Sequence, residues 1–279
     1  MIENAYAKIN LSLDVVRRRD DGYHDVNMIM QSLELHDTVH AELIQSGIEV
    51  NCDSAFVPNG EGNIAYRAAK IMLEETKSEK GVRIQIEKSI PVCAGLAGGS
   101  TDGAAVIRAM NRLLGAGYRL DKLVSIAARV GSDVPFCING GTALAYGTGT
   151  QIRQLPSFGK HIVLLVKPPI DVPTPWVYKN LNLSEVNHPD IDGFEAALTG
   201  GNSLSALSLS GNVLESVTTK KYPVIEDIKA GMVLHGARFA MMSGSGPTVF
   251  GIFDDLCDAQ NAEIFFKKSY GEVIVTKTV

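Results

Sequence analysis

The chain has 279 residues, of which 45% are hydrophobic and 20% charged, with a formal net charge of −5. The length suggests about two domains with a sizeable core, and the composition excludes a disordered chain, a collagen-like repeat and a disulfide-stapled mini-protein. The negative charge argues against a general electrostatic grip on nucleic acid, although a helix N-terminus can still create a local site for a small anion.

The N-terminal half begins with an alternating segment. Apolar and polar residues alternate from Ala7 to Val15, which is typical of a half-buried strand and puts Lys8 and Asn10 on one face. Five further elements are expected in this half: strands at Val39–Leu43 and Val82–Ile86, and helices over Asn63–Glu75, from Ser100 to Leu114, and from a capping Asp121 to Gly131.

The pattern of elements breaks at Leu155–Lys160, where Pro, Ser and Gly cluster. We place the domain boundary there, with one domain at residues 1–157 and the other at 158–279. Interleaved strands and helices in the second half favour an α+β domain of open-sandwich type. The expected strands are Ile162–Val166, Thr248–Phe253 and Val273–Val275, and the expected helices are Asp192–Leu198, Pro223–Val233 and Asp254–Lys268.

The cysteines and the termini carry little functional signal. Cys52, Cys93, Cys137 and Cys257 contain no C-x-x-C pair, so we expect reduced, mostly buried thiols and neither a zinc site nor a disulfide framework. The first residues lack the basic and apolar regions of a secretory signal, and no apolar run approaches the length of a membrane helix. We therefore expect a cytoplasmic protein with no membrane partner.

The segment Pro91–Thr101 (PVCAGLAGGST), here called the glycine loop, directly precedes a helix. Gly95, Gly98 and Gly99 let the backbone approach a ligand because they carry no Cβ. The first N–H groups of a helix have no intrahelical partner, and together with the helix dipole they form a site that suits phosphate. The loop matches neither a Walker A motif nor G-x-G-x-x-G, so taken alone it fits an ordinary strand-to-helix turn equally well.

Three further segments are ambiguous when each is taken alone. Gly131–Phe136 (GSDVPF) places Asp133 in a short loop after a helix, where an aspartate is usually a turn former. Lys8 lies on the polar face of a strand, where a lysine is normally solvated. Ser243–Pro247 (SGSGP) leads into a strand, and it fits a tight turn as well as an anion-binding nest.

Together these segments are far more specific. Ala7–Leu11 (AKINL), the glycine loop and Ser243–Pro247 resemble the three ordered motifs of the GHMP kinase superfamily, whose members phosphorylate small hydroxyl compounds with ATP. Asp20–His24 (DDGYH) and Gly131–Phe136 resemble the branch whose substrate is a methylerythritol carrying a cytidine diphosphate group. The resemblance implies an α+β, two-domain GHMP kinase fold. Its N-terminal part is ribosomal-protein-S5-domain-2-like, its C-terminal part is a ferredoxin-like open sandwich, and the active site lies in the cleft between the domains.

The resemblance also assigns roles to residues. Lys8 and Asp133 match the catalytic pair, in which the aspartate accepts the hydroxyl proton and the lysine offsets negative charge on the transferred phosphoryl group. ATP is the implied co-substrate, with Mg²⁺ whose protein ligands the sequence does not identify. The residues matched to ATP are Asn63 and Lys88 near the adenine and its sugar, and Pro91, Val92, Cys93, Ala94, Gly95, Leu96, Ala97, Gly98, Gly99, Ser100 and Thr101 around the phosphates. The residues matched to the other substrate are Asn10, Tyr23, His24, Thr174, Tyr178, Ser243 and Gly244, with Tyr178 standing where the family often has Phe.

The implied reaction is ATP-dependent phosphorylation of the 2-hydroxyl of the cytidylated methylerythritol, on the non-mevalonate route to isoprenoid precursors. One alternative is another GHMP kinase of the homoserine or mevalonate type. Tyr23, His24 and the segment Thr174–Tyr178 argue against it, because those substrates carry no base to stack. A different class of alternative is a non-catalytic nucleotide-binding relative, which would not need both Lys8 and Asp133. The sequence does not indicate the oligomeric state.

Overall fold

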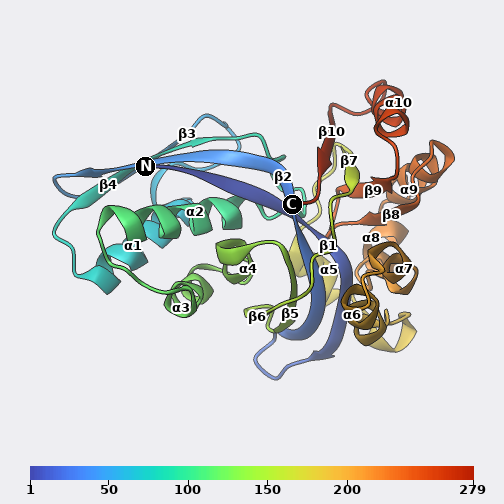
Figure 1. Ribbon diagram of the computed structural model, residues 1–279, viewed down its shortest axis with the longest axis horizontal. Coiled ribbons are helices and arrows are strands. Elements are labelled where there is room, and N and C mark those ends of the chain that lie inside the picture. Colours follow the sequence, from blue (N-terminus) through green and yellow to red (C-terminus); the bar gives the residue numbers. More distant parts are fainter.

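The computed structural model describes all 279 residues and contains two sheets, the first of which includes the long strands β1 and β2 (Figure 1). The first sheet runs in the order β3-β4-β2-β5-β6, and β1 pairs antiparallel with β2 along nearly its whole length. Its strands are β1 (Ile2–Arg18), β2 (His24–Ile44), β3 (Ile48–Cys52), β4 (Gly81–Glu87), β5 (Thr142–Gly147) and β6 (Gln151–Gln154).

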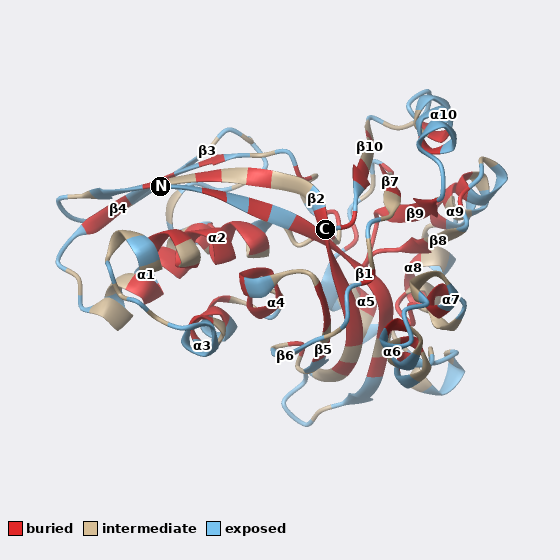
Figure 2. Cartoon of the chain, viewed as in Figure 1, coloured by how far each residue is buried: buried red, intermediate tan, exposed pale blue.

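Helices of the N-terminal half lie along one side of this sheet (Figure 1). They are α1 (Ile64–Thr76), α2 (Gly98–Leu113), α3 (Leu120–Val130) and α4 (Val134–Asn139). The helix α2 packs on β1 and β2 because its apolar residues recur at helical spacing, with Val106, Ala109 and Met110 fully buried (Figure 2). This packing fixes the N-terminus of α2 close to the middle of β1.

The second sheet is antiparallel throughout and has the order β10-β7-β9-β8. Its strands are β7 (Ile162–Lys167), β8 (Phe239–Met242), β9 (Val249–Phe253) and β10 (Glu272–Lys277). The helices α9 and α10 pack against it. The helices of this half are α5 (Thr174–Lys179), α6 (Ile191–Thr199), α7 (Ser203–Ala206), α8 (Glu215–Lys221), α9 (Val224–Leu234) and α10 (Leu256–Phe266). Short 3₁₀ turns occur at Gly60–Gly62 (η1), Leu183–Glu185 (η2) and Leu207–Leu209 (η3).

The two halves are joined by contacts between residues far apart in the sequence. Thr278, just after β10, forms a bridge with Leu33 of β2, and Asn212 forms one with Leu13 of β1. The larger hydrophobic cluster, of 51 buried residues, includes side chains from both sheets. The sheets divide between residues 2–154 and 162–277. The expected domain boundary after residue 157 falls between these two ranges. The exact residue of the boundary stays a prediction.

Every expected strand and helix is present. Three expectations about these elements and one about the cysteines need correction in detail. The helix expected from Ser100 begins at Gly98, and α3 has Arg119 as its N-cap, with Asp121 in the first turn. The segment Val39–Leu43 is part of the 21-residue strand β2. All four cysteines are free, but Cys93 and Cys257 are exposed, so the expectation of mostly buried thiols is wrong.

No helix in the structure combines the length and the apolar character needed to cross a bilayer. The expected cytoplasmic location and the expected lack of a nucleic-acid partner stay predictions.

Candidate active site

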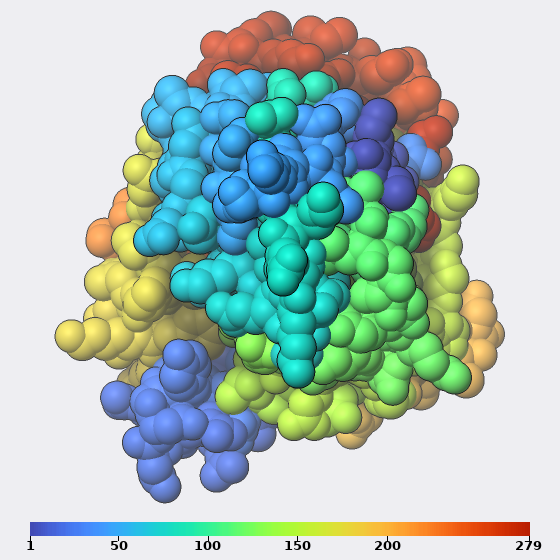
Figure 3. Space-filling model, turned by 90° about the vertical axis from the view of Figure 1, so that its left-hand side faces the viewer, coloured from blue at the N-terminus to red at the C-terminus, as the bar shows by residue number.

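A cavity of about 910 Å³ lies where the two halves of the chain meet. Figure 3 shows three segments that are distant in sequence around a recess on one face: the blue connection between β1 and β2, the yellow region of α5, and the cyan region that precedes the glycine loop. The volume is in the range typical of sites for small organic ligands. The lining includes these predicted site residues: Lys8, Asn10, Tyr23, His24, Asn63, Lys88, Pro91, Val92, Cys93, Ala94, Gly95, Ala97, Gly98, Gly99, Ser100, Asp133, Thr174, Tyr178 and Gly244.

The glycine loop delivers an uncapped helix N-terminus to this cavity. Ala97, the N-cap of α2, has a left-handed backbone (φ 60°), and no side chain caps the helix. Cys93, also with left-handed backbone (φ 54°), precedes it in the loop. Left-handed backbone is costly for non-glycine residues and is often kept at functional sites. The free N–H groups of the first turn and the positive end of a 16-residue helix therefore form an anion site.

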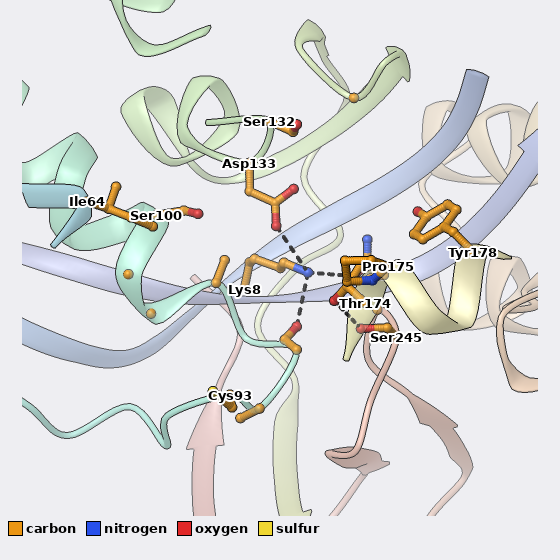
Figure 4. A pocket seen from close by; sticks show the side chains of 18 of the residues that line it. Lys8, Ile64, Cys93, Ser100, Ser132, Asp133, Thr174, Pro175, Tyr178 and Ser245 are labelled. Atoms are coloured by element: carbon orange, nitrogen blue, oxygen red, sulfur yellow. Dashed lines mark hydrogen bonds and ion pairs between the residues drawn. The ribbon is translucent and has the colours of Figure 1, made fainter. Parts of the chain in front are cut away.

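Lys8 lies at the centre of the cavity (Figure 4). The residue is only 4% exposed, so the expectation for an ordinary strand lysine, a solvated side chain, does not hold. Its Nζ donates to Asn10 Oδ1 at 2.7 Å and to the Gly95 carbonyl at 3.0 Å, and it lies 3.9 Å from Asp133 Oδ2. Burying an ammonium without partners is costly, and these contacts supply the partners and fix its position.

Asp133 faces Lys8 from the start of α4 (Figure 4). It occupies the N-cap position of that helix, but its carboxylate makes no capping hydrogen bond. Its side chain is 34% exposed and lines the cavity. The ordinary interpretation of this residue as a turn former therefore leaves its side chain unexplained. A carboxylate that faces a buried ammonium across an open cavity can accept a proton from a bound hydroxyl.

The carbonyl oxygen of Gly95 links three of the predicted motifs. It accepts hydrogen bonds from Lys8 of β1 and from the Ser243 hydroxyl, which lies 3.0 Å away. A Cβ on Gly95 would lie 2.3 Å from the Ser243 carbonyl, and one on Gly244 would lie 3.6 Å from Lys8 Nζ. The backbones at Gly95 and Ser243 approach so closely that a side chain on Gly95 would not fit. Segments separated by 87 and 148 residues thus meet around one atom.

Lys88 is held in a buried cluster with two aspartates. Its Nζ donates to Asp37 and, at 2.8 Å, to Asp102 Oδ2. Asp37 also accepts from the backbone N–H groups of Ser89 and Ile90, which fixes the approach to the glycine loop. Burial raises the pKa of Asp102 to about 7 against the opposing effect of Lys88, and its second oxygen has no partner. Burial alone would lower the pKa of Lys88, but the two carboxylates raise it above its ordinary value.

Asn63 is likewise engaged within the protein. Its side chain accepts from Ala65 N–H as the N-cap of α1 and donates to the Pro58 carbonyl. Asn63 and Lys88 therefore line the cavity while most of their polar atoms are already paired. They shape this end of the cavity and hold its walls in place.

Aromatic residues lie at the opposite end of the cavity. The rings of His24 and Tyr178 are 5.2 Å apart between centroids, which is direct contact and leaves no room for a base between them. Tyr23 is 65% exposed and free to provide a second surface. Burial, with a smaller effect of Arg18, lowers the pKa of His24, so its imidazole is neutral at pH 7 with one donor and one acceptor. Burial raises the pKa of the Tyr178 phenol.

Three predicted site residues do not line the cavity. The Thr101 hydroxyl donates to the Tyr6 carbonyl, which ties α2 to β1, and Ser243 bonds to the glycine loop. Leu96 is buried in the core. Small and polar residues of such motifs can either bind the ligand or hold the surrounding backbone in place by hydrogen bonds. Sequence alone does not separate these two roles.

Sequence reasoning also missed residues that line the cavity. Phe56 is 85% exposed and lies outside any strand or helix. The short apolar segment Ala55–Pro58 that contains it was an available signal. Arg18 and Lys179 follow no pattern that would single them out. The lining residues that were not predicted are Leu13, Arg18, Gly22, Val26, Met28, Phe56, Val57, Pro58, Gly62, Ile64, Asp102, Ser132, Thr148, Gly149, Pro175, Lys179, Leu214 and Ser245.

Family models match both halves of the chain: "GHMP kinases N terminal domain" over residues 63–141 and "GHMP kinases C terminal" over residues 183–271. A 4-diphosphocytidyl-2-C-methyl-D-erythritol kinase from Acetivibrio thermocellus is 51% identical over 276 residues, covering 99% of this chain and 98% of the relative. One from Clostridium beijerinckii is 47% identical, covering 99% of each chain. The chain belongs to the 4-diphosphocytidyl-2-C-methyl-D-erythritol kinase family of GHMP kinases.

Solved structures agree with this family and its fold. A crystal structure of a 4-(cytidine 5'-diphospho)-2C-methyl-D-erythritol kinase matches with a TM-score of 0.85 at 31% identity, covering 100% of this chain and 99% of that one. A homoserine kinase from Cytophaga hutchinsonii matches with a TM-score of 0.73 at 20% identity, covering 98% and 94%, which shows a shared fold alone. The resemblance and the two-domain GHMP kinase fold expected from the motifs are thereby confirmed, and the protein is an ATP-dependent kinase.

Proposed function

We propose that the protein transfers the γ-phosphoryl group of ATP to the 2-hydroxyl of 4-diphosphocytidyl-2-C-methyl-D-erythritol, a step of the non-mevalonate route to isoprenoid precursors. The observation that carries this proposal is the placement of Lys8 and Asp133 beside the uncapped N-terminus of α2 in one cavity. Phosphoryl transfer requires a proton acceptor, a cation and a phosphate cradle in a fixed arrangement, and these groups supply all three.

The glycine loop supports binding of the ATP phosphates. Backbone N–H groups at Gly98, Gly99 and Ser100 provide preorganised donors, which cost little reorganisation when charge develops during transfer. Mg²⁺ bound to the phosphates would neutralise part of their charge. No group of three or more His, Cys, Asp or Glu side chains is arranged to hold a metal ion. The hydroxyl of Ser100 lines the cavity and suits a phosphate-bound Mg²⁺ shell, whereas the hydroxyl of Thr101 is already bonded to Tyr6.

Asp133 and Lys8 support the chemical step. The carboxylate of Asp133 takes the proton of the attacking 2-hydroxyl as the new P–O bond forms and the bond to ADP breaks. Lys8 offsets the negative charge on the transferred group, while Asn10 and the Gly95 carbonyl hold its ammonium in place. In this proposal Asn10 acts mainly by orienting Lys8.

The aromatic end of the cavity supports recognition of the cytosine. Tyr23 and Tyr178 offer aromatic faces, and stacking on such a face contributes about 1–3 kcal/mol per base. Stacking accepts any base, so discrimination needs hydrogen bonds to the edge, for which neutral His24 has one donor and one acceptor. Thr174 bonds to Ser245 at 2.8 Å and fixes the start of the helix that carries Tyr178 (Figure 4).

The opposite end of the cavity supports binding of the adenine. Phe56, Val57 and Ile64 provide apolar walls beside Asn63, Lys88 and Asp102. The phosphates of ATP would then run from this end along the glycine loop toward Lys8.

A substrate panel tests the proposal. Initial rates of ADP formation are compared for the cytidylated substrate, uncytidylated methylerythritol phosphate, homoserine and mevalonate at fixed ATP and Mg²⁺. We expect kcat/KM for the cytidylated compound to exceed the others by at least about a hundredfold, since two lost base contacts of 1–3 kcal/mol each correspond to that order. Equal use of methylerythritol phosphate would overturn the substrate while leaving the kinase assignment in place.

A further inference from the structure

A second cavity, of about 370 Å³, lies behind the helix α5 and shares no lining residue with the first. Its volume falls within the range of small-ligand sites. Three segments build it: α5 with its C-cap, the turn η2 with its flanks, and α8, which contributes residues from both its first and its last turn. The lining residues are Trp176, Asn180, Asn182, Glu185, Val186, Ser216, Val217, Lys220 and Lys221.

The helix α5 is the wall between the two cavities. Thr174 and Tyr178 line the first cavity, whereas Trp176 and Asn180 line the second. Residues four apart share one face of a helix, and residues two apart are about 200° apart around it. The two pairs therefore lie on opposite sides of α5 and its C-cap, Asn180. A ligand in the second cavity would press on the helix that positions Tyr178.

The charges in the second cavity are unpaired. Lys220, Lys221 and Glu185 all line it, and none of them takes part in an ion pair of the protein. Lys221 Nζ lies 4.0 Å from the centroid of the Trp176 ring, which leaves its N–H donors available. Both lysines belong to the last turn of α8, where they also complement the helix dipole. The helix dipole explains why lysines occur at this end of α8. It does not explain why they line a cavity that also has the Trp176 indole in its wall.

We infer that the second cavity binds a small phosphorylated compound, and that occupancy changes affinity for the cytidylated substrate through α5. The ammonium groups of two consecutive lysines that both line the cavity suit a phosphate, because its oxygens accept several charge-assisted hydrogen bonds. Trp176, Val186 and Val217 provide apolar surface for the ester portion. Glu185 repels negative charge at the η2 end, so the phosphate lies at the Lys220 end. The effect on affinity rests on the proposed function, whereas the binding does not.

Trp176 is the only tryptophan of the chain, so its fluorescence reports directly on this cavity. The probe is inorganic pyrophosphate, titrated at constant free Mg²⁺ with the first cavity saturated by a non-hydrolysable ATP analogue. We expect a saturable fluorescence change whose midpoint moves at least tenfold to higher concentration in Lys220→Met. That variant keeps Lys221 on the indole ring. Glu185→Gln should move the midpoint several-fold in the opposite direction, because it removes the opposing charge.

Lys268→Met is the matched control, since it removes the same charge just beyond the end of α10, far from the cavity in sequence and outside its lining. No saturable change in the wild type would overturn the inferred site. A midpoint in Lys220→Met equal to that of the wild type would also overturn it, because binding would then not depend on Lys220.

A kinetic measurement tests the link to α5. We expect saturating pyrophosphate to change KM for the cytidylated substrate at least threefold with KM for ATP unaltered, and Lys220→Met to abolish this change. Binding without an effect on KM would refute the link through α5. An enzyme inactive on the cytidylated compound would refute the proposed function, and the fluorescence titration would still decide the site.

Discussion

Replacement of Asp133 by asparagine tests the proposed proton acceptor, because it preserves the size of the side chain. Loss of a general base lowers a rate by about 10²- to 10⁴-fold. That corresponds to about 3–5 kcal/mol of activation free energy. The lost interaction develops as the hydroxyl gives up its proton, so the decrease should appear in kcat. The dissociation constants of ATP and of the second substrate should change little.

The same substitution has a structural cost that can be compared with the catalytic one. Asp133 Oδ2 lies 3.9 Å from Lys8 Nζ. Two unit charges at that distance attract by about 4 kcal/mol at an effective dielectric constant of about 20. The Asp133 side chain is 34% exposed, so water screens much of this attraction. We expect a loss of about 1 kcal/mol in unfolding free energy. The melting temperature would then fall by about 2–4 °C, too little to explain the fall in kcat.

The assay is coupled detection of ADP with the cytidylated substrate, together with calorimetric titration of both ligands. Asp121→Asn is the matched control, because it makes the same chemical change on an exposed residue in the first turn of α3. It should keep wild-type kcat. A folded Asp133→Asn enzyme with kcat within threefold of wild type would refute the assignment of Asp133 as the base.

Three further substitutions address other parts of the site. Gly95→Ala should lower unfolding free energy in urea by more than 2 kcal/mol, since left-handed backbone at φ +73° costs about 1–2 kcal/mol and the new Cβ would meet the Ser243 carbonyl. In Gly99→Ala, as control, the new methyl would meet only the Ile64 side chain, so equal losses would contradict this account. Tyr178→Ala should raise KM for the cytidylated substrate at least tenfold with KM for ATP unchanged; a proportional rise in both would argue against cytosine stacking. The raised pKa of Asp102, about 7, means that the folded state binds a proton that the unfolded chain releases near pH 4. The contribution of Asp102 to the unfolding free energy therefore falls as pH rises from about 4 to 7. The unfolding free energy of Asp102→Asn relative to wild type should be higher at pH 8 than at pH 5. The same difference at both pH values would contradict this expectation.

The limits of sequence-based prediction are clear at Lys8. The alternation from Ala7 to Val15 correctly predicts the strand and the shared face of Lys8 and Asn10. It also predicts a solvated lysine, yet the residue is 4% exposed. The covering comes from the glycine loop and from Gly244, which are distant in the sequence. Period-two patterns report which residues share a face, but not what later packs on that face.

Other features depended on tertiary contacts in the same way. Only Val39–Leu43 of β2 was predicted, because residues 28–33 of the strand are buried on both faces and show no alternation of burial. The motif resemblance located the Asn63 and Lys88 segments near one end of the cavity. It could not show that Lys88 is engaged by Asp37 and Asp102, since these three side chains come from different elements. Cavity residues that follow no sequence pattern, such as Arg18 and Lys179, required the folded chain.

The most direct test of the proposed reaction is the structure of its product. The protein is incubated with ATP, Mg²⁺ and 4-diphosphocytidyl-2-C-methyl-D-erythritol, and the product is examined by mass spectrometry and by ³¹P and ¹³C NMR. We predict one added phosphoryl group, with phosphorus–carbon coupling that places it on the oxygen at C2, and one ADP formed for each product molecule. ADP formation without a phosphorylated product, or a phosphoryl group on another hydroxyl, would contradict the account.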